Sequence, residues 1–124
     1  MNRDRVAVIT GAGSGVGRSA ALALLGGGYK VTLVGRRVEA LEETASLAGN
    51  NSGNALPISA DAGNADSVAR VFKETVDSFG RLNVLFNNAG ISVGAPSLEQ
   101  ITPEQWQSVV DINLTGTFLC TREA

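Results

Sequence analysis

Histidine is absent from this chain of 124 residues, and cysteine occurs once, as Cys120. The first absence excludes histidine general bases and histidine-ligated metal sites within the chain. A lone cysteine excludes an internal disulfide and is typical of a reducing compartment. No apolar run approaches the ~18 residues of a membrane span, and the polar N-terminal residues 1–5 do not resemble a signal segment. We therefore expect a cytoplasmic protein with no metal site and no membrane-spanning segment.

An excess of positive charge is also missing. The chain has 10 lysines and arginines against 12 aspartates and glutamates, a net charge of -2. Such a chain has no basic field to attract nucleic acid, so we expect no nucleic-acid partner. Its length allows one domain at most. We expect residues 1–124 to form part of a single domain, with no second domain.

Apolar runs of strand length alternate with stretches of helical periodicity. The pattern predicts strands at 6–10, 30–35, 55–60 and 82–87, helices at 15–25, 37–48, 68–79 and from 103 onward, and a flexible stretch at 90–97. Because the strands are near-continuous apolar runs, we expect them to be buried on both faces of a parallel sheet. Alternation of this kind is typical of a doubly wound α/β fold with the strand order 3-2-1-4. Pro57 agrees with this order, because proline favours a strand at a sheet edge.

The last predicted helix begins with strong capping signals. Thr102 is a candidate N-cap, Pro103 occupies the first helical position, and Gln105 completes a capping box. Within this helix, Asn113 shares a predicted face with Trp106, Val109, Val110 and Thr117. We therefore expect the Asn113 amide to point toward the core, where an unpartnered amide costs about 1–3 kcal/mol. A hydrogen bond to a neighbouring backbone group is the simplest structural explanation for it.

The strongest functional signal is the transition from the first strand to the first helix. Its glycines are arranged as Thr10-Gly11-x-x-x-Gly15-x-Gly17, which places unpaired backbone N–H groups and the positive end of a helix dipole where a phosphate can bind. The general dinucleotide pattern G-x-G-x-x-G does not fit, because it would need glycine at Val16 or Arg18. An ordinary glycine-rich turn is the alternative. The candidate phosphate-binding residues are Gly11, Ser14, Gly15, Val16 and Gly17.

Three further segments accompany this loop. Asn87-Asn88-Ala89-Gly90 ends the fourth predicted strand, Asp61 follows the third, and Asp111-Ile112-Asn113-Leu114 lies in the last helix. Together, over roughly residues 5–124, these motifs resemble the short-chain dehydrogenase/reductase family in its simple branch, not the extended branch with T-G-x-x-G-x-x-G. The resemblance implies a Rossmann-type doubly wound sheet, of which four strands are present, truncated relative to the family.

The resemblance also implies roles for several residues. Asp61, with its neighbour Ala62, would hydrogen-bond the adenine amino group, and Asn88, Ala89 and Gly90 would lie close to the adenosine ribose. Asn113 would hold a water that continues a proton relay from an active-site lysine. The structural alternatives are a solvated turn carboxylate at Asp61, turn residues in the second motif, and a backbone-bonded amide at Asn113.

The end of the second predicted strand indicates the cofactor. A site that prefers NAD places an acidic residue there to bind the ribose 2′-OH, but this position is Gly35, followed by Arg36 and Arg37. Glycine leaves room for a 2′-phosphate, and arginine can bind it with charge-assisted hydrogen bonds. We therefore predict NADP(H) over NAD(H), with Arg36 as the main contact and Arg37 as support; a solvated helix-end charge is the alternative for Arg37.

The catalytic residues that the resemblance implies are mostly missing. The family transfers a hydride with the help of a serine, a tyrosine and a lysine four positions after the tyrosine, but the single tyrosine, Tyr29, has Leu33 at that position. Only Asn113 remains, so we expect the nucleotide-binding, N-terminal part of a longer NADP(H)-dependent oxidoreductase. We expect it to act on a small-molecule carbonyl or alcohol and to form a homo-oligomer at full length. The alternative is a catalytically inactive nucleotide-binding or interaction fragment. In a truncated sheet, the fourth strand, built around Val84-Leu85-Phe86, would become an unprotected apolar edge. The last helix would leave Trp106, Val110, Leu114 and Phe118 partly exposed.

Overall fold

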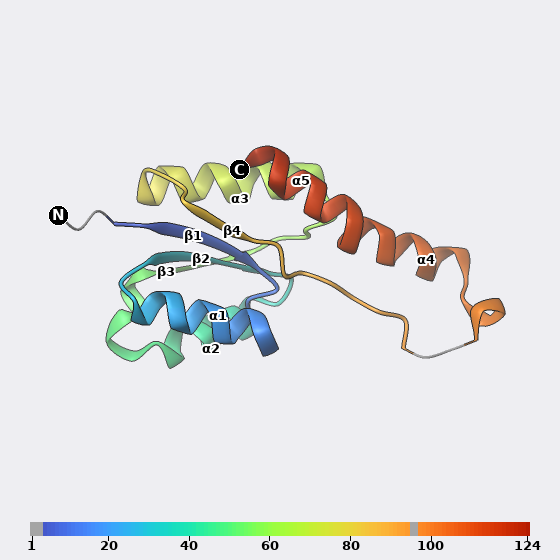
Figure 1. Cartoon of the computed structure of the whole chain (residues 1–124), viewed down its shortest axis with the longest axis horizontal. Helices are drawn as coiled ribbons and strands as arrows, with labels where there is room; N and C mark the ends of the chain where they lie inside the picture. Colours follow the sequence, from blue (N-terminus) through green and yellow to red (C-terminus); the bar gives the residue numbers. More distant parts are fainter. Residues whose placement is uncertain (1–3, 95–96) are drawn as a thin grey trace.

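The computed structural model describes residues 4–94 and 97–124, which form a four-stranded parallel sheet with helices on both faces (Figure 1). The strands are β1 (Val6–Thr10), β2 (Lys30–Gly35), β3 (Ala55–Ser59) and β4 (Val84–Phe86). Their order is β3-β2-β1-β4, and each neighbouring pair is parallel. This confirms the predicted doubly wound arrangement, including the edge position of Pro57.

The helices form two layers, one on each side of the sheet. Figure 1 shows α1 (Gly15–Gly26) and α2 (Val38–Leu47) below the sheet, with α3 (Ala65–Phe79) and α5 (Gly116–Glu123) above it. Local signals mark the ends of α3: the Asn64 side chain caps it by accepting a 2.9 Å hydrogen bond from the Ser67 N–H. Gly80 ends it with a φ of 83°, a conformation that glycine adopts without a Cβ penalty.

Each face of the sheet has its own hydrophobic core, and β1 contributes to both. Val8 is fully buried in the cluster beneath α3 and α5, while its neighbour Ile9 is fully buried in the cluster beneath α1 and α2. Burying a side chain of this size stabilises the fold by roughly 1.5–3 kcal/mol. Because successive side chains enter opposite cores, β1 and β2 have continuous apolar sequences rather than alternating ones.

The expectation that the strands are buried on both faces does not hold for the fourth, which instead forms the exposed apolar edge expected of a truncated sheet. β4 pairs with β1 on one side only, so Val84 is 36% exposed and Leu85 and Phe86 are half-buried. Several element boundaries also differ from the prediction: β4 spans 84–86 rather than 82–87, and α3 begins at Ala65 rather than at 68. The third strand ends at Ser59, and the loop after α2 forms a 3₁₀ helix, Gly49–Asn54. Short 3₁₀ segments are common connectors and leave no periodic signal in a sequence.

The segment after β4 leads away from the sheet. Residues 90–94 form neither helix nor strand, while residues 95–96 of the predicted flexible stretch lie outside the described residues. A 3₁₀ helix, Leu98–Gln100, precedes α4 (Pro103–Val109), which extends past the carboxyl ends of the strands (Figure 1). Thr102 and Gln105 form the predicted capping box, with hydrogen bonds of 2.9 and 3.1 Å.

The predicted last helix is interrupted by a π-helix, Val110–Thr115, before α5 begins. The buried face is the one that packs against Ala62 and the α3 core, and it differs from the predicted face. The buried side of this segment consists of Ile112, Gly116, Leu119 and Cys120. Asn113 is exposed, so the prediction that its amide points into the core was wrong.

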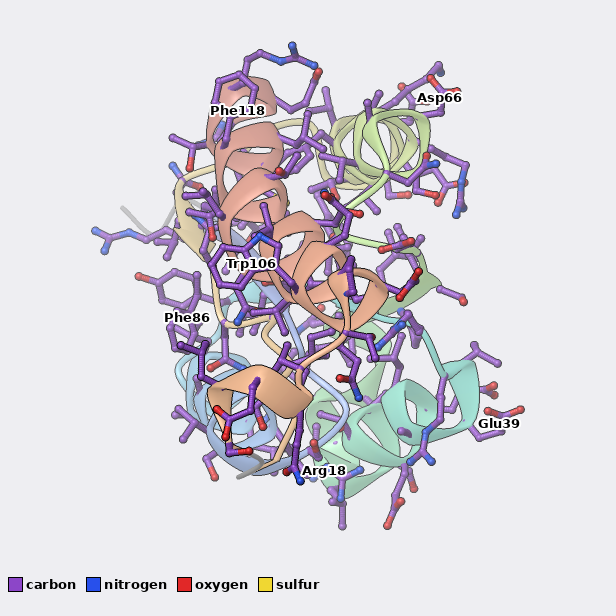
Figure 2. The ribbon with its side chains drawn as sticks, turned by 90° about the vertical axis from the view of Figure 1, so that its right-hand side faces the viewer. Arg18, Glu39, Asp66, Phe86, Trp106 and Phe118 are labelled. Carbon is purple, nitrogen blue, oxygen red and sulfur yellow. The ribbon has the colours of Figure 1, made fainter. Side chains whose placement is uncertain are left out.

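Apolar side chains are exposed along the same helical segment, as predicted. Trp106 is 62% exposed, Leu114 67% and Phe118 58%, whereas Val110 is half-buried. Figure 2 shows Trp106 and Phe118 on successive parts of this segment.

Candidate functional site

Two neighbouring cavities lie at the carboxyl ends of β1 and β2. One has a volume of about 120 Å³ and the other about 240 Å³, and they share Gly11, Gly35 and Arg36. Open parallel sheets bind their ligands at this edge. The sequence-predicted residues that line one or both cavities are Gly11, Ser14, Arg36, Arg37, Ala62, Ala89 and Gly90.

The glycine loop between β1 and α1 needs its glycines for different reasons. Gly11 and Gly15 have φ angles of 66° and 54°, in the left-handed region that favours glycine. Gly17 has no room for a Cβ, because the carbonyl oxygen of Gly11 and the side-chain nitrogen of Asn88 already occupy that space. Val16 is 68% exposed at the start of α1. The first N–H groups of α1 have no partner within the helix, which suits them to bind an anion.

Thr10 fastens the segment after β4 to this loop. Its buried hydroxyl accepts hydrogen bonds from the N–H groups of Asn88 at 3.0 Å and Ala89 at 2.8 Å. The side chain of Asn88 in turn donates to the carbonyl of Gly11 at 3.2 Å. Two motifs more than 70 residues apart in the sequence therefore form one continuous wall of the site.

Replacing Thr10 by valine is expected to loosen this wall. Valine has the same shape but leaves the N–H groups of Asn88 and Ala89 without their acceptor, and each lost partner costs about 1–3 kcal/mol. We expect the free energy of unfolding in urea to fall by about 2–4 kcal/mol. Thr10→Ser, which keeps the oxygen, is the control and should lose less than half as much. A valine variant as stable as the serine variant would contradict the role of the hydroxyl.

The end of β2 carries positive charge and no carboxylate. Gly35 is the last residue of the strand, and Arg36 and Arg37 follow it with exposed side chains. Ser59 on the adjacent β3 fixes this turn by donating a 3.0 Å hydrogen bond to the Arg36 carbonyl. Among residues 4–94 and 97–124, neither arginine side chain has an ion-pair partner. Both are available to a bound anion.

Asp61 lies in a turn at the carboxyl end of β3. Its carboxylate is exposed and accepts a 2.9 Å hydrogen bond from the Gly63 N–H, which is the geometry expected of a turn aspartate. Its neighbour Ala62 is buried against α5, where Gly116 has no space for a Cβ beside the Ala62 carbonyl. Asp61 borders the site, and a role in binding adenine stays a prediction.

Asn113 forms a two-way bridge to the chain after β4. Its side-chain oxygen accepts from the Ile91 N–H at 2.8 Å, and its side-chain nitrogen donates to the Ile91 carbonyl at 2.9 Å. This is the backbone-bonded arrangement that the sequence left open as the structural alternative. Asn113 does not line the two cavities above, although its partner Ile91 lines the first of them. It lines a third cavity of about 310 Å³, with Ile91–Gly94, Ile101, Trp106 and Val109. Its predicted part in a proton relay is untested.

Reasoning from the sequence missed two polar residues of the site. Thr10 was part of a motif but was given no role, and Arg18 was noted only as a mismatch to a glycine pattern. Arg18 lies between α1 and α2 (Figure 2) and bonds both the glycine loop and α2. Its partner Thr44 is 26 positions away, so no local spacing could have found the pair.

Cys120 lies beneath the site, among the side chains that α3 and α5 bury. Burial raises the pKa of the Cys120 thiol, so the group stays protonated and acts as a small apolar side chain. Across the described residues no group of three acidic, cysteine or histidine side chains could hold a metal ion. Nor is any described helix long and apolar enough to cross a membrane.

Comparison with known proteins adds a sequence relationship to this geometry. A family model described as short chain dehydrogenase matches residues 5–124. A 3-oxoacyl-[acyl-carrier-protein] reductase of Synechocystis sp. is 41% identical over 119 residues, which make up 95% of this chain and 48% of that protein. The chain therefore spans about half the length of the curated relatives it matches.

Solved structures show the same architecture. The crystal structure of a 3-ketoacyl-(acyl-carrier-protein) reductase from Brucella melitensis, complexed with NADH, matches with a TM-score of 0.90 and 35% identity, covering 96% of this chain and 48% of that one. An alcohol dehydrogenase from the archaeon Thermococcus sibiricus, complexed with 5-hydroxy-NADP, matches with a TM-score of 0.90 and 31% identity, covering 98% and 52%. Both similar structures contain a nicotinamide cofactor.

Proposed function

The chain belongs to the short-chain dehydrogenase family, and we propose that it is the NADP(H)-binding half of an oxidoreductase that acts on a carbonyl or alcohol. One observation carries the choice of cofactor: β2 ends in glycine, and Arg36 and Arg37 line a cavity that also borders the glycine loop. A 2′-phosphate needs the space that an acidic side chain would otherwise fill, and it needs a positive partner.

The residues present fit a dinucleotide. Gly17 keeps the space between the Gly11 carbonyl and Asn88 free of a Cβ, so the loop backbone can come close to a pyrophosphate. The start of α1 would face the pyrophosphate, Ala89 and Gly90 the ribose, and Asp61 with Ala62 the adenine. When bound, the nicotinamide ring supplies the hydride donor or acceptor. The part of this chain is to bind and orient the cofactor.

Asn113 and the third cavity are proposed to belong to the substrate side. The Asn113–Ile91 bridge fixes one wall of this cavity, which is mostly apolar. In the family that the chain resembles, a serine, a tyrosine and a lysine complete the reaction, and this chain has no Tyr-x-x-x-Lys pair. The exposed apolar side chains Trp106, Leu114 and Phe118 are compatible with a subunit contact in a homo-oligomer.

A second candidate is a nucleotide-binding module without activity of its own. Both candidates would bind the cofactor, but only an oxidoreductase would turn over a substrate. Cofactor binding and substrate turnover are therefore measured separately. We expect the 124-residue chain to bind NADP⁺ at least tenfold more tightly than NAD⁺ in isothermal titration calorimetry, because one charge-assisted contact contributes about 1.5–3 kcal/mol.

The same preparation should not consume NADPH with a 3-oxoacyl-[acyl-carrier-protein], the compound in the name of the Synechocystis relative. Turnover by this chain would contradict the proposed division of roles. Equal affinity for both cofactors would contradict the proposed NADP(H) preference. An Arg81→Met variant, altered at an exposed arginine before β4, serves as the binding control.

A further inference from the structure

Arg18 makes several hydrogen bonds that have no role in the cofactor site as proposed so far. From the first turns of α1, its guanidinium donates to the Gly13 carbonyl at 2.7 Å, to the Ala40 carbonyl at 3.2 Å and to the Thr44 hydroxyl at 2.9 Å. The side chain is only 23% exposed. It also approaches Glu43 at 3.4 Å, but that carboxylate is 64% exposed, and an ion pair so open to water contributes little.

The carbonyls of two successive loop residues are held in this way. Arg18 donates a hydrogen bond to the Gly13 carbonyl. The fully buried Thr44 donates a 2.8 Å hydrogen bond to the Ala12 carbonyl. The described chain has no cis peptide bond, and in a planar trans peptide the N–H points opposite to the C=O. The N–H groups of Gly13 and Ser14, which share these two peptide planes, therefore point away from Thr44 and Arg18.

These two N–H groups have no acceptor within the part of the chain that the structure describes. Gly13 and Ser14 both line the 240 Å³ cavity that Arg36 and Arg37 also line. The cavity thus combines two oriented backbone donors with two arginines that have no ion pair within the described part of the chain. Successive N–H groups that converge in this way form an anion-binding concavity.

We infer that Arg18 is a positioning residue: with Thr44, it orients the Gly13 and Ser14 N–H groups to bind the 2′-phosphate of NADP(H) beside Arg36. This inference rests on the proposed function and deepens it, since it adds the backbone half of the 2′-phosphate site. Arginine suits the task because its planar guanidinium reaches three acceptors on two elements at once. A lysine at this position could donate a hydrogen bond to the Gly13 carbonyl, but it could not also reach the Ala40 carbonyl and the Thr44 hydroxyl.

The experiment compares two nucleotides that each carry a single phosphate, adenosine 2′-monophosphate and adenosine 5′-monophosphate, by titration calorimetry with the 124-residue chain. Arg18→Met keeps much of the apolar stem and removes the donors. We expect it to lower affinity for the 2′-nucleotide about tenfold, equal to 1.4 kcal/mol, and for the 5′-nucleotide less than twofold. Arg18→Lys should give an intermediate loss, and Arg81→Met, at an exposed arginine elsewhere, should change neither affinity.

A second measurement detects the Gly13 and Ser14 N–H groups directly. In the unaltered chain, the amide NMR signals of Gly13 and Ser14 should shift when the 2′-nucleotide is added, and in Arg18→Met this shift should be largely lost. An equal loss of affinity for both nucleotides, or no loss for either, overturns the inference. Arg18→Lys provides the same comparison if the methionine variant does not fold.

The two proposals fail in different ways. If the unaltered chain binds the 5′-nucleotide but not the 2′-nucleotide, the NADP(H) preference is wrong, and the inference is wrong with it. If the unaltered chain binds the 2′-nucleotide and Arg18→Met binds it equally well, only the role of Arg18 is wrong.

Discussion

Replacing Gly17 by alanine is expected to lower the free energy of unfolding by about 2–3 kcal/mol, as overpacking does in a filled site, and to weaken NADP⁺ binding about 100-fold. The new Cβ would overlap the carbonyl oxygen of Gly11 and lie 2.5 Å from the side-chain nitrogen of Asn88. The first of these atoms belongs to the backbone and cannot rotate aside. The loop would have to move away from Asn88, and this movement would separate the two motifs that Thr10 joins into one wall.

Gly26→Ala is the matched control for this substitution. Gly26 is the last residue of the same helix, its φ is not positive, and a Cβ there would meet no atom within 4 Å. Alanine at such a position stabilises a protein by about 0.4–1 kcal/mol, mainly through the unfolded chain. Urea unfolding and titration calorimetry on both variants separate the effects. The interpretation of Gly17 fails if its alanine variant binds NADP⁺ as well as the Gly26 variant does.

Elements with a strong local pattern were predictable from the sequence. β1 and β2 are apolar along their whole length because both faces of the sheet are covered, and both strands begin and end as expected. The strand order followed from the alternation of strands and helices and from Pro57 at the edge. These features depend on periodicity and on single-residue chemistry, which a sequence displays directly.

Features that depend on distant neighbours were not predictable. The local pattern of β4 is that of a buried strand, and its exposed edge was expected only because the sheet was expected to be truncated; residues 4–94 and 97–124 place no strand on its other side. The last helix offered more than one face with helical spacing, and the pattern placed Asn113 on the buried one. The face that is buried contains Ile112 and Gly116, and it is set by Ala62, a residue distant in the sequence against which Gly116 packs.

The candidate site also has features that local sequence predicts and features that it does not. The glycine spacing and the Gly35-Arg36 pair are local, and the cavities at the ends of β1 and β2 contain residues from both. The hydrogen bonds that align the site are not local. Thr10 reaches a motif 78 positions away, and Arg18 reaches Thr44 on another helix. A motif can indicate which residues meet a ligand, but the atoms that orient those residues emerge only from the fold.

Replacing Arg36 by aspartate is expected to lower affinity for NADP⁺ about 100-fold and to leave affinity for NAD⁺ unchanged or improved. The substitution removes a charge-assisted contact, which contributes about 1.5–3 kcal/mol, and places a negative charge beside the proposed 2′-phosphate. The same carboxylate could accept a hydrogen bond from the 2′-OH of NAD⁺. Because Arg36 lies after β2 with an exposed side chain, the fold should tolerate the change, and thermal unfolding would check this.

Two matched variants determine whether position matters or only net charge. Arg37→Asp makes the same charge change one residue further on and should cost NADP⁺ affinity about tenfold, in keeping with a supporting contact. Arg81→Asp makes it at an exposed position before β4 and should have little effect, because charges farther apart than a Debye length of about 8 Å are largely screened at physiological salt. Equal losses in all three variants would mean that only overall charge attracts the cofactor. A decreasing series from Arg36 through Arg37 to Arg81 would instead locate the 2′-phosphate at the end of β2, where Gly35 leaves space for it.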